Sequence, residues 1–219
     1  MIPKPAVGDL APEATLIDRT GASVALSSTW QGHPAVLVFL RYFGCPFCQM
    51  QVVGLRADRE RFEERRATVV LIGQGSAEQG ARFCDEKQVS FKCVLDTEGW
   101  VYSDYGLGRG SLGQVFGPAS IVPFLRANLH AETRQRGLKG GSMMQMPGTF
   151  VVDSHGVVRF AHRNRTISDS PRNEHILEVL GGLDRVPAGS DGRGTSVANG
   201  TPGAVRPGDE PRRVAPRAP

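Results

Sequence analysis

Two uninterrupted apolar runs stand out in the first third of the chain. Residues 35–40, Ala-Val-Leu-Val-Phe-Leu, contain no polar position, and residues 68–73 are apolar except at their ends. A half-buried strand would alternate polar and apolar residues, whereas strands covered on both faces read as continuous apolar runs. The sequence therefore predicts two central strands at 35–40 and 68–73.

Helical periodicity follows each of these strands. Apolar residues at 52, 55 and 62 predict a helix from Cys48 to about Arg66. Ser76-Ala77-Glu78-Gln79 resembles a capping box and predicts a second helix that runs to about Lys87. A short helix is expected at 100–105. The last one is expected at 173–180, after Ser170-Pro171, with Gly181-Gly182 ending it.

Shorter alternating segments complete the pattern. Residues 14–18 and 23–26 flank a Gly-containing turn, as do 149–153 and 157–162, so each pair predicts a β-hairpin, and 91–95 predicts a single strand. The order β-α-β-α-β-(insert)-β-β-α predicts an α/β fold, with a central mixed sheet, helices on both faces and an N-terminal hairpin.

Composition sets the domain boundaries. Residues 1–184 are expected to form one domain with a helical insert at about 106–145, its helix around 121–133. The segment 187–219 has six Gly and six Pro among 33 residues, too few apolar side chains to offset its ordering entropy. The tail, residues 185–219, is therefore predicted to be disordered.

Charge and hydropathy exclude some function classes. The net charge is +4, of which the tail supplies +3. The domain therefore lacks the excess of basic residues that is typical of nucleic-acid-binding domains. No apolar run approaches the ~20 residues of a membrane span, and residues 1–5 lack the apolar region of a secretory signal. We expect a cytoplasmic protein with neither nucleic acid nor membrane as a partner.

The candidate chemistry lies directly after the first apolar run. Cys45, Pro46, Phe47 and Cys48 form a C-x-x-C at the predicted start of a helix. That spacing places the two sulfurs one helical turn apart, within reach of a disulfide. Backbone N–H groups and the helix dipole stabilise a thiolate at the first cysteine, and Pro46 fits the first helical turn. The setting predicts a thiol redox site.

The four cysteines allow two alternatives to redox chemistry. The four cysteines could bind zinc, although C-x-x-C followed by C-x8-C is not zinc-ribbon spacing. The motif could also be a pair of buried structural cysteines. Cys84, on a predicted helix, and Cys93, in a predicted strand, are expected to pack in the core as thiols, which together with the C-x-x-C suits a reducing compartment. No metal is expected.

Pro147 is a further candidate site residue. It precedes the predicted strand at 149–153, where it could carry a cis peptide bond facing the C-x-x-C or be an ordinary strand-entry proline. No cofactor is expected, since the glycine-rich stretch 106–110 lacks the strand-to-helix context of a dinucleotide loop.

Residues 5–182 resemble the thioredoxin-fold redoxins, in particular their peroxiredoxin-like (AhpC/TSA-related) branch. The resemblance rests on the run at 36–40 before the C-P-F-C motif, on Pro-Gly-Thr-Phe-Val-Val-Asp at 147–153 and on Arg-Phe-Ala-His-Arg at 159–163. It implies a thioredoxin-like three-layer fold. Aligned with thioredoxins, Cys45 is the attacking cysteine, Cys48 the resolving one and Pro147 the cis-proline.

The same resemblance allows a second alignment. The P-x-x-x-T-x-x-C motif of typical peroxiredoxins falls on Arg41, Cys45 and Cys48, so that Cys48 takes the peroxidatic position while Arg41 replaces proline and Cys45 replaces threonine. The arginine that peroxiredoxins carry before the T-F-V-x-D strand is absent, and Pro147 stands near its place. Arg41, Pro46, Phe47 and Pro147 are the expected neighbours of the two sulfurs.

Three hypotheses follow. The first is a thiol–disulfide oxidoreductase with an antioxidant role, with Cys45 as nucleophile and Cys48 as resolver. The second is a thiol peroxidase that reduces hydrogen peroxide or alkyl hydroperoxides through Cys48. The third is a non-enzymatic redox sensor. The expected partners are a thioredoxin- or glutathione-type thiol donor and a disulfide or peroxide substrate.

Overall fold

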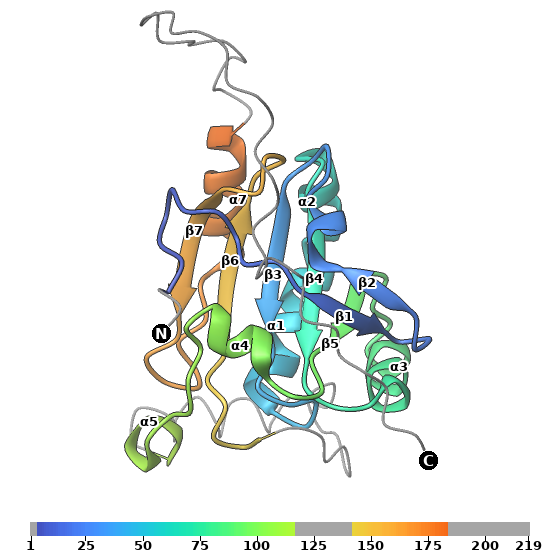
Figure 1. Ribbon diagram of the computed structural model, residues 1–219, viewed down its shortest axis with the longest axis vertical. Helices are drawn as coiled ribbons and strands as arrows, with labels where there is room; N and C mark the ends of the chain where they lie inside the picture. The colour runs from blue at the N-terminus through green and yellow to red at the C-terminus, as the bar shows by residue number, and fades with distance from the viewer. Residues whose placement is uncertain (1–3, 117–141, 184–219) are drawn as a thin grey trace, which may run out of the picture.

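The computed structural model describes residues 4–116 and 142–183 (Figure 1). The predicted insert helix at 121–133 and the tail at 185–219 lie outside the described residues. In chain order the elements are β1 (Thr15–Asp18), β2 (Ser23–Ala25), the 3-10 helix η1 (Leu26–Thr29), β3 (Ala35–Phe39), α1 (Pro46–Ala57), α2 (Arg59–Glu64), β4 (Thr68–Gly73), α3 (Ala77–Glu86), β5 (Lys92–Leu95), α4 (Trp100–Asp104), α5 (Leu112–Phe116), β6 (Gly148–Val152), β7 (Val158–Arg163) and α7 (Asn173–Leu183).

The strands form one mixed sheet in the order β2-β1-β5-β4-β3-β6-β7. β3, β4 and β5 run parallel to one another, whereas β6 pairs antiparallel with β3, and both predicted hairpins are present. All five residues of β3 are buried, as its continuous apolar run predicts. The expected α/β class with a central mixed sheet is confirmed.

Helices cover the two faces of this sheet unequally. Side chains of α1, α2, α3 and α7 pack on one face around Val36 and Val38, and η1 and α4 pack on the other around Leu37 and Phe39. Figure 1 shows α4 lying across the sheet near the ends of β3 and β4. The alternating direction of side chains along β3 therefore supplies both cores.

Helix boundaries differ from the predictions in two places. The predicted helix from Cys48 to Arg66 is two helices, because α1 ends at Ala57 and α2 begins at Arg59, with Asp58 between them. The last helix does not stop at Gly181-Gly182 but continues to Leu183. Its buried Ile176, Leu177 and Leu180 hold it to the sheet, and such packing outweighs the roughly 1 kcal/mol that a helical glycine costs.

The chain elements nearest the C-x-x-C converge at one edge of the sheet. The ends of β3 and β4 meet the start of β6 there, since Phe39 pairs with both Ile72 and Gly148. The buried Tyr102 hydroxyl of α4 lies 2.6 Å from the Leu40 carbonyl oxygen and 2.9 Å from that of Ile72, so one proton is shared between two strand ends. This edge carries the candidate site. None of the helices in the described residues is long and apolar enough to cross a membrane.

Candidate active site

The C-x-x-C lies at the start of α1, which follows β3 after a short turn. Cys45 is the residue that caps the helix, with extended backbone angles, and Pro46 occupies the first turn. The Cys45 carbonyl accepts the first helical hydrogen bond from the Gln49 N–H, at 3.0 Å. The sequence folds this way because N–H groups in the first turn of a helix have no acceptor within the helix, and proline has no N–H. The fixed φ of proline also suits a helix start. Cys45 is therefore beside the positive end of the helix dipole.

The two sulfurs have opposite acid–base character. The Cys48 thiol donates a hydrogen bond to the Cys45 sulfur, and this bond together with Arg41 lowers the pKa of Cys45 to about 6, although burial opposes the change. The same hydrogen bond, together with burial, raises the pKa of Cys48 well above its usual range. A thiol that donates a hydrogen bond to a neighbouring sulfur stabilises that neighbour as the thiolate. Cys45 is thus the sulfur of the pair that ionises at the lower pH.

Both cysteines are buried. The exposed fraction is 0% for Cys45 and 2% for Cys48. Phe47, the other residue inside the motif, is 7% exposed and belongs to the same apolar cluster. A substrate can reach Cys45 only when the side chains around it move aside.

Arg41 brings a guanidinium group to this buried pair. Its Nη1 lies 3.5 Å from the Cys45 sulfur, and its backbone N–H lies 3.4 Å from the Cys48 sulfur. The Arg41 side chain is 3% exposed, and no carboxylate in the described residues forms an ion pair with it. Since a buried charge needs a counter-charge, the Cys45 thiolate is the anion available to balance this cation.

The rest of the Arg41 guanidinium is held by backbone carbonyls. Nε donates to the Gln145 carbonyl oxygen at 3.0 Å, and Nη2 donates to the carbonyl oxygen of Met143. These acceptors lie about a hundred positions away along the chain, so no local pattern identified them. In the sequence Arg41 is visible only as a departure from the proline of typical peroxiredoxins. The structure brings the Arg41 guanidinium to Cys45 from the turn that follows β3.

Pro147 lies at the start of β6, at the same edge of the sheet as the motif. The described residues contain no cis peptide bond, so the cis-peptide alternative for Pro147, which the alignment with thioredoxins implies, is wrong. The Pro147 carbonyl accepts a hydrogen bond from the Asn164 N–H at 3.2 Å, which fits an ordinary strand-entry proline at the β6–β7 pair. Its role as a neighbour of the reacting sulfurs stays a prediction.

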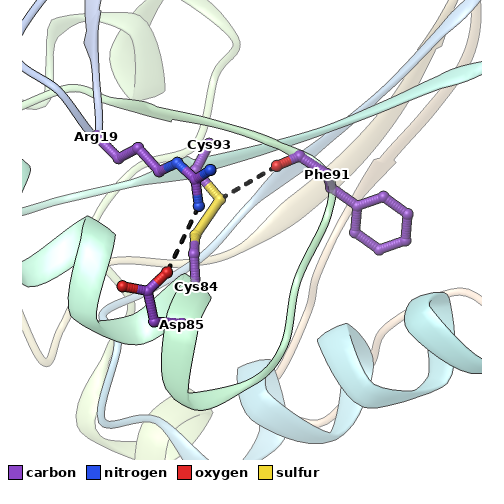
Figure 2. The surroundings of a disulfide bond; sticks show 5 residues. All are labelled: Arg19, Cys84, Asp85, Phe91 and Cys93. Atoms are coloured by element: carbon purple, nitrogen blue, oxygen red, sulfur yellow. Dashed lines mark hydrogen bonds and ion pairs between the residues drawn. A yellow bond between two sulfur atoms is a disulfide. The ribbon is translucent and has the colours of Figure 1, made fainter.

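Cys84 and Cys93 are joined by a disulfide, which corrects the expectation that they pack as separate core thiols. Figure 2 shows the bond connecting α3 to β5, next to the ion pair of Arg19 with Asp85 at 3.6 Å. The Cys93 sulfur lies 3.7 Å from the Phe91 carbonyl oxygen, a contact without a hydrogen bond because a disulfide sulfur carries no proton. The two residues are nine positions apart on different elements, so only the packing of α3 on β5 brings them together.

This pairing also removes the four-cysteine zinc alternative. Cys84 and Cys93 are bonded to each other, and Cys45 and Cys48 are free. Within residues 4–116 and 142–183, no three His, Cys, Asp or Glu side chains gather where they could hold a metal ion. The two free sulfurs of the motif therefore remain as a dithiol.

A cleft of about 920 Å³ opens at the same sheet edge. Gln74 and Gly75, after β4, form one side of it, and Leu107, Gly108 and Gln145 form another. Gln145 is the residue whose carbonyl accepts a hydrogen bond from Arg41, so the cleft borders the segment that holds this guanidinium.

Comparison with known proteins places this site in a family. The model of the AhpC/TSA family matches residues 7–161. Human peroxiredoxin-like 2C is 26% identical over 179 residues, covering 77% of this chain and 78% of that protein. Human prostamide/prostaglandin F synthase is 29% identical over 167 residues, covering 74% of this chain and 82% of that protein.

The fold agrees with a solved structure of the same kind. The crystal structure of the peroxidoxin BcpB from Mycobacterium tuberculosis superposes with a TM-score of 0.59 at 22% identity, covering 84% of this chain and 99% of that one. This likeness confirms the predicted thioredoxin-like fold. The family match, joined to the close dithiol of Cys45 and Cys48, shows that the chain belongs to the AhpC/TSA family and is a peroxiredoxin-like, thiol-dependent oxidoreductase.

Proposed function

We propose that this protein is a thiol–disulfide oxidoreductase in which Cys45 attacks the substrate and Cys48 resolves the product. The observation that carries the proposal is the opposite displacement of the two thiol pKa values, down for Cys45 and up for Cys48. A thiolate attacks, and a protonated thiol waits until its neighbour has reacted.

The proposed reaction moves two electrons from the dithiol to the substrate. The Cys45 thiolate attacks one sulfur of a substrate disulfide, forming a mixed disulfide and releasing the other sulfur as a thiolate. Cys48 then loses its proton and attacks the Cys45 sulfur. The second substrate thiolate leaves, and a Cys45–Cys48 disulfide forms. An external thiol donor returns the pair to the dithiol by the reverse exchange.

A peroxide substrate fits the same first step. The Cys45 thiolate would attack one peroxide oxygen, the alcohol or water would leave, and Cys48 would condense with the resulting sulfenic acid, releasing water. The buried Arg41 guanidinium beside Cys45 favours this route over attack through Cys48, whose raised pKa keeps it protonated. An antioxidant role in the cell would follow from either substrate.

The test measures disulfide reduction and peroxide consumption side by side for Cys45→Ser and Cys48→Ser. We expect Cys45→Ser to abolish both activities, and Cys48→Ser to trap a mixed disulfide at Cys45 that mass spectrometry detects. The double variant Cys84→Ala/Cys93→Ala is the matched control and should retain both activities.

Three results would overturn this assignment. Disulfide exchange that survives Cys45→Ser unchanged would show that Cys45 is not the nucleophile. Peroxide turnover by Cys45→Ser that is lost in Cys48→Ser would support the Cys48 peroxidase instead. A reversible Cys45–Cys48 disulfide with neither activity would point to the redox sensor.

We also propose a cytoplasmic location, on the basis of the free dithiol of Cys45 and Cys48, whereas the Cys84–Cys93 disulfide is the feature that argues for an oxidising compartment. Trapping the thiols in intact cells and counting modified cysteines checks this. Recovery of the protein only in a membrane-enclosed compartment would contradict it.

A further inference from the structure

We propose that Gln145, braced by Gln74, is a positioning residue that keeps the Arg41 guanidinium against the Cys45 sulfur. The proposal rests on the function given above and deepens it, because it names what sets the acidity of the attacking thiol. Among the described residues, no hydrogen bond joins either glutamine to the Cys45 or Cys48 sulfur, so both would act through Arg41.

Arg41 depends on the backbone of one short segment for its orientation. Two of its three guanidinium nitrogens donate to carbonyls of this segment, those of Met143 and Gln145, which leaves Nη1 directed at Cys45. A planar guanidinium presents its donors in a fixed fork. A shift of these two carbonyls would therefore move the charge relative to the sulfur.

The Gln145 side chain fixes the position of those carbonyls. Its amide nitrogen is 2.7 Å from the Leu107 carbonyl oxygen and 3.3 Å from that of Gly108, and the side chain is buried. The backbone adds support, since the Met146 N–H donates to the Gly108 carbonyl at 3.1 Å. The amide thus ties the segment to the loop after α4.

Gln74 holds the same segment from the other side. Its Nε2 donates to the Gln145 side-chain oxygen at 3.2 Å, and its Oε1 accepts from the Ser142 N–H at 2.9 Å. Gln74 directly follows β4 and is also buried. One amide therefore connects both ends of the 142–145 segment to the rigid sheet.

The hydrogen bonds made by Gln145 and Gln74 require amide side chains at both positions. Each side chain has to donate and accept at once, as Gln74 does toward Gln145 and Ser142. A carboxylate cannot donate, and it would face the carbonyl oxygens of Leu107 and Gly108. Amides also leave the Cys45 thiolate as the only counter-charge for Arg41 in this part of the described structure.

The test reads the pKa of Cys45 directly, independent of turnover. The rate of alkylation of Cys45 by iodoacetamide, followed by mass spectrometry of its peptide across pH 5–9, gives this pKa in the full chain. We expect Gln145→Met, which keeps the length of the side chain and adds no charge, to raise the pKa by about one unit, the lower end of what a displaced neighbouring charge produces. At a pH below both pKa values, this increase lowers the thiolate fraction, and with it the alkylation rate, about tenfold.

A double-mutant comparison separates positioning from general loosening of the fold. In an Arg41→Met background, Gln145→Met should produce no further change, because the charge it positions is already gone. Gln74→Met acts from the β4 side and should raise the pKa in the same direction, which keeps the test valid should Gln145→Met fail to fold.

Gln51→Met serves as the control. Gln51 is a part-buried glutamine of α1 that donates to Thr149 at 3.1 Å and accepts from Ser170 at 3.4 Å, with no contact to Arg41. It should leave the pKa of Cys45 unchanged. The positioning role is wrong if folded Gln145→Met and Gln74→Met keep the wild-type pKa, or if Gln145→Met shifts it equally without Arg41. Either result would leave the oxidoreductase proposal standing, since that one is tested by turnover.

Discussion

At the scale of single residues, Cys45 is set apart from Cys48 by two contacts. The Cys48 thiol donates to the Cys45 sulfur, and the Arg41 guanidinium lies 3.5 Å from it. Burial acts against both, because a low-polarity environment disfavours the charged form. The hydrogen bond and the cation together outweigh that penalty at Cys45, whereas at Cys48 the donated proton and burial act in the same direction.

A pH profile of alkylation should resolve the two thiols. Because the thiolate predominates above the pKa, the alkylation rate of Cys45 should rise with pH. It should pass its half-maximum where the pH equals the Cys45 pKa of about 6 and reach a plateau at higher pH. Cys48 should remain unreactive through neutral pH, since its pKa is raised. Peptide-resolved alkylation measures both, and a Cys45 midpoint near the free-thiol value of about 8.5 would contradict the assignment.

Cys48→Ala should move that midpoint upward. The variant removes the hydrogen bond that contributes most to the acidity of Cys45 and leaves Arg41 in place. We expect a pKa increase of roughly one to two units, measured in the same alkylation experiment. The control Cys93→Ala removes a sulfur that does not contact the pair and should leave the midpoint unchanged.

At the scale of elements, α3 connects the site to the rest of the sheet. The buried Phe83 of α3 packs against Phe43, which lies two residues before Cys45, with tilted rings whose centroids are 4.9 Å apart. The next residue along α3, Cys84, is bonded to Cys93 of β5. The capping box of Ser76 and Gln79 begins the helix as the sequence predicts. The disulfide and the aromatic pair then hold α3 between β5 and the turn that carries the dithiol.

The Cys84–Cys93 disulfide should contribute to stability. Closing a loop of nine residues removes chain entropy from the unfolded state, which corresponds to about 2–3 kcal/mol. Urea unfolding of Cys84→Ala/Cys93→Ala should show a loss of that size in the free energy of unfolding. Wild type kept in a reductant should lose a similar amount.

Ser76→Ala provides the comparison, because it removes only the cap of α3 and should cost about 1 kcal/mol. A double cysteine variant as stable as wild type under oxidising conditions would show that the bond is not formed in solution. Counting free thiols in the denatured wild-type protein checks the same point, with two expected without reductant.

At the scale of the whole molecule, two apolar cores meet at β3. One core contains the two sulfurs of the motif and the disulfide cysteines, and the other contains Tyr102 and the aromatic side chains around Phe39. The rings of Phe39, Tyr105 and Phe150 lie within 4.9–5.7 Å of one another. This packing fixes the strand ends from which the C-x-x-C and the Arg41 side chain emerge.

Limited proteolysis should test the predicted domain boundary. The tail contains six arginines, at 185, 193, 206, 212, 213 and 217, and its Gly- and Pro-rich composition predicts that it is open to cleavage. Trypsin should remove the tail first and leave a species that ends near Arg185 with its alkylation profile unchanged. Early cleavage within α1 or α3 instead would contradict the boundary.

The sequence by itself was enough to predict the central strands, both hairpins, the cap of α3 and the C-x-x-C at a helix start. Each of these depends on residues close together in the chain, through periodicity, capping or the fixed φ of proline. The split between α1 and α2 and the passage of α7 through Gly181-Gly182 were not predicted, since tertiary packing decides where a marginal helix stops.

The tertiary structure alone decided the electrostatics of the site and the pairing of Cys84 with Cys93. Arg41 reaches Cys45 because carbonyls at 143 and 145 hold it there. The disulfide exists because α3 packs on β5. Contacts between residues so far apart in sequence, or on different elements, cannot be predicted from the periodicity of the chain, because periodicity reports only on local structure. The sequence thus determined the C-x-x-C at which we propose that the chemistry occurs, and the fold decided which of its two thiols ionises first.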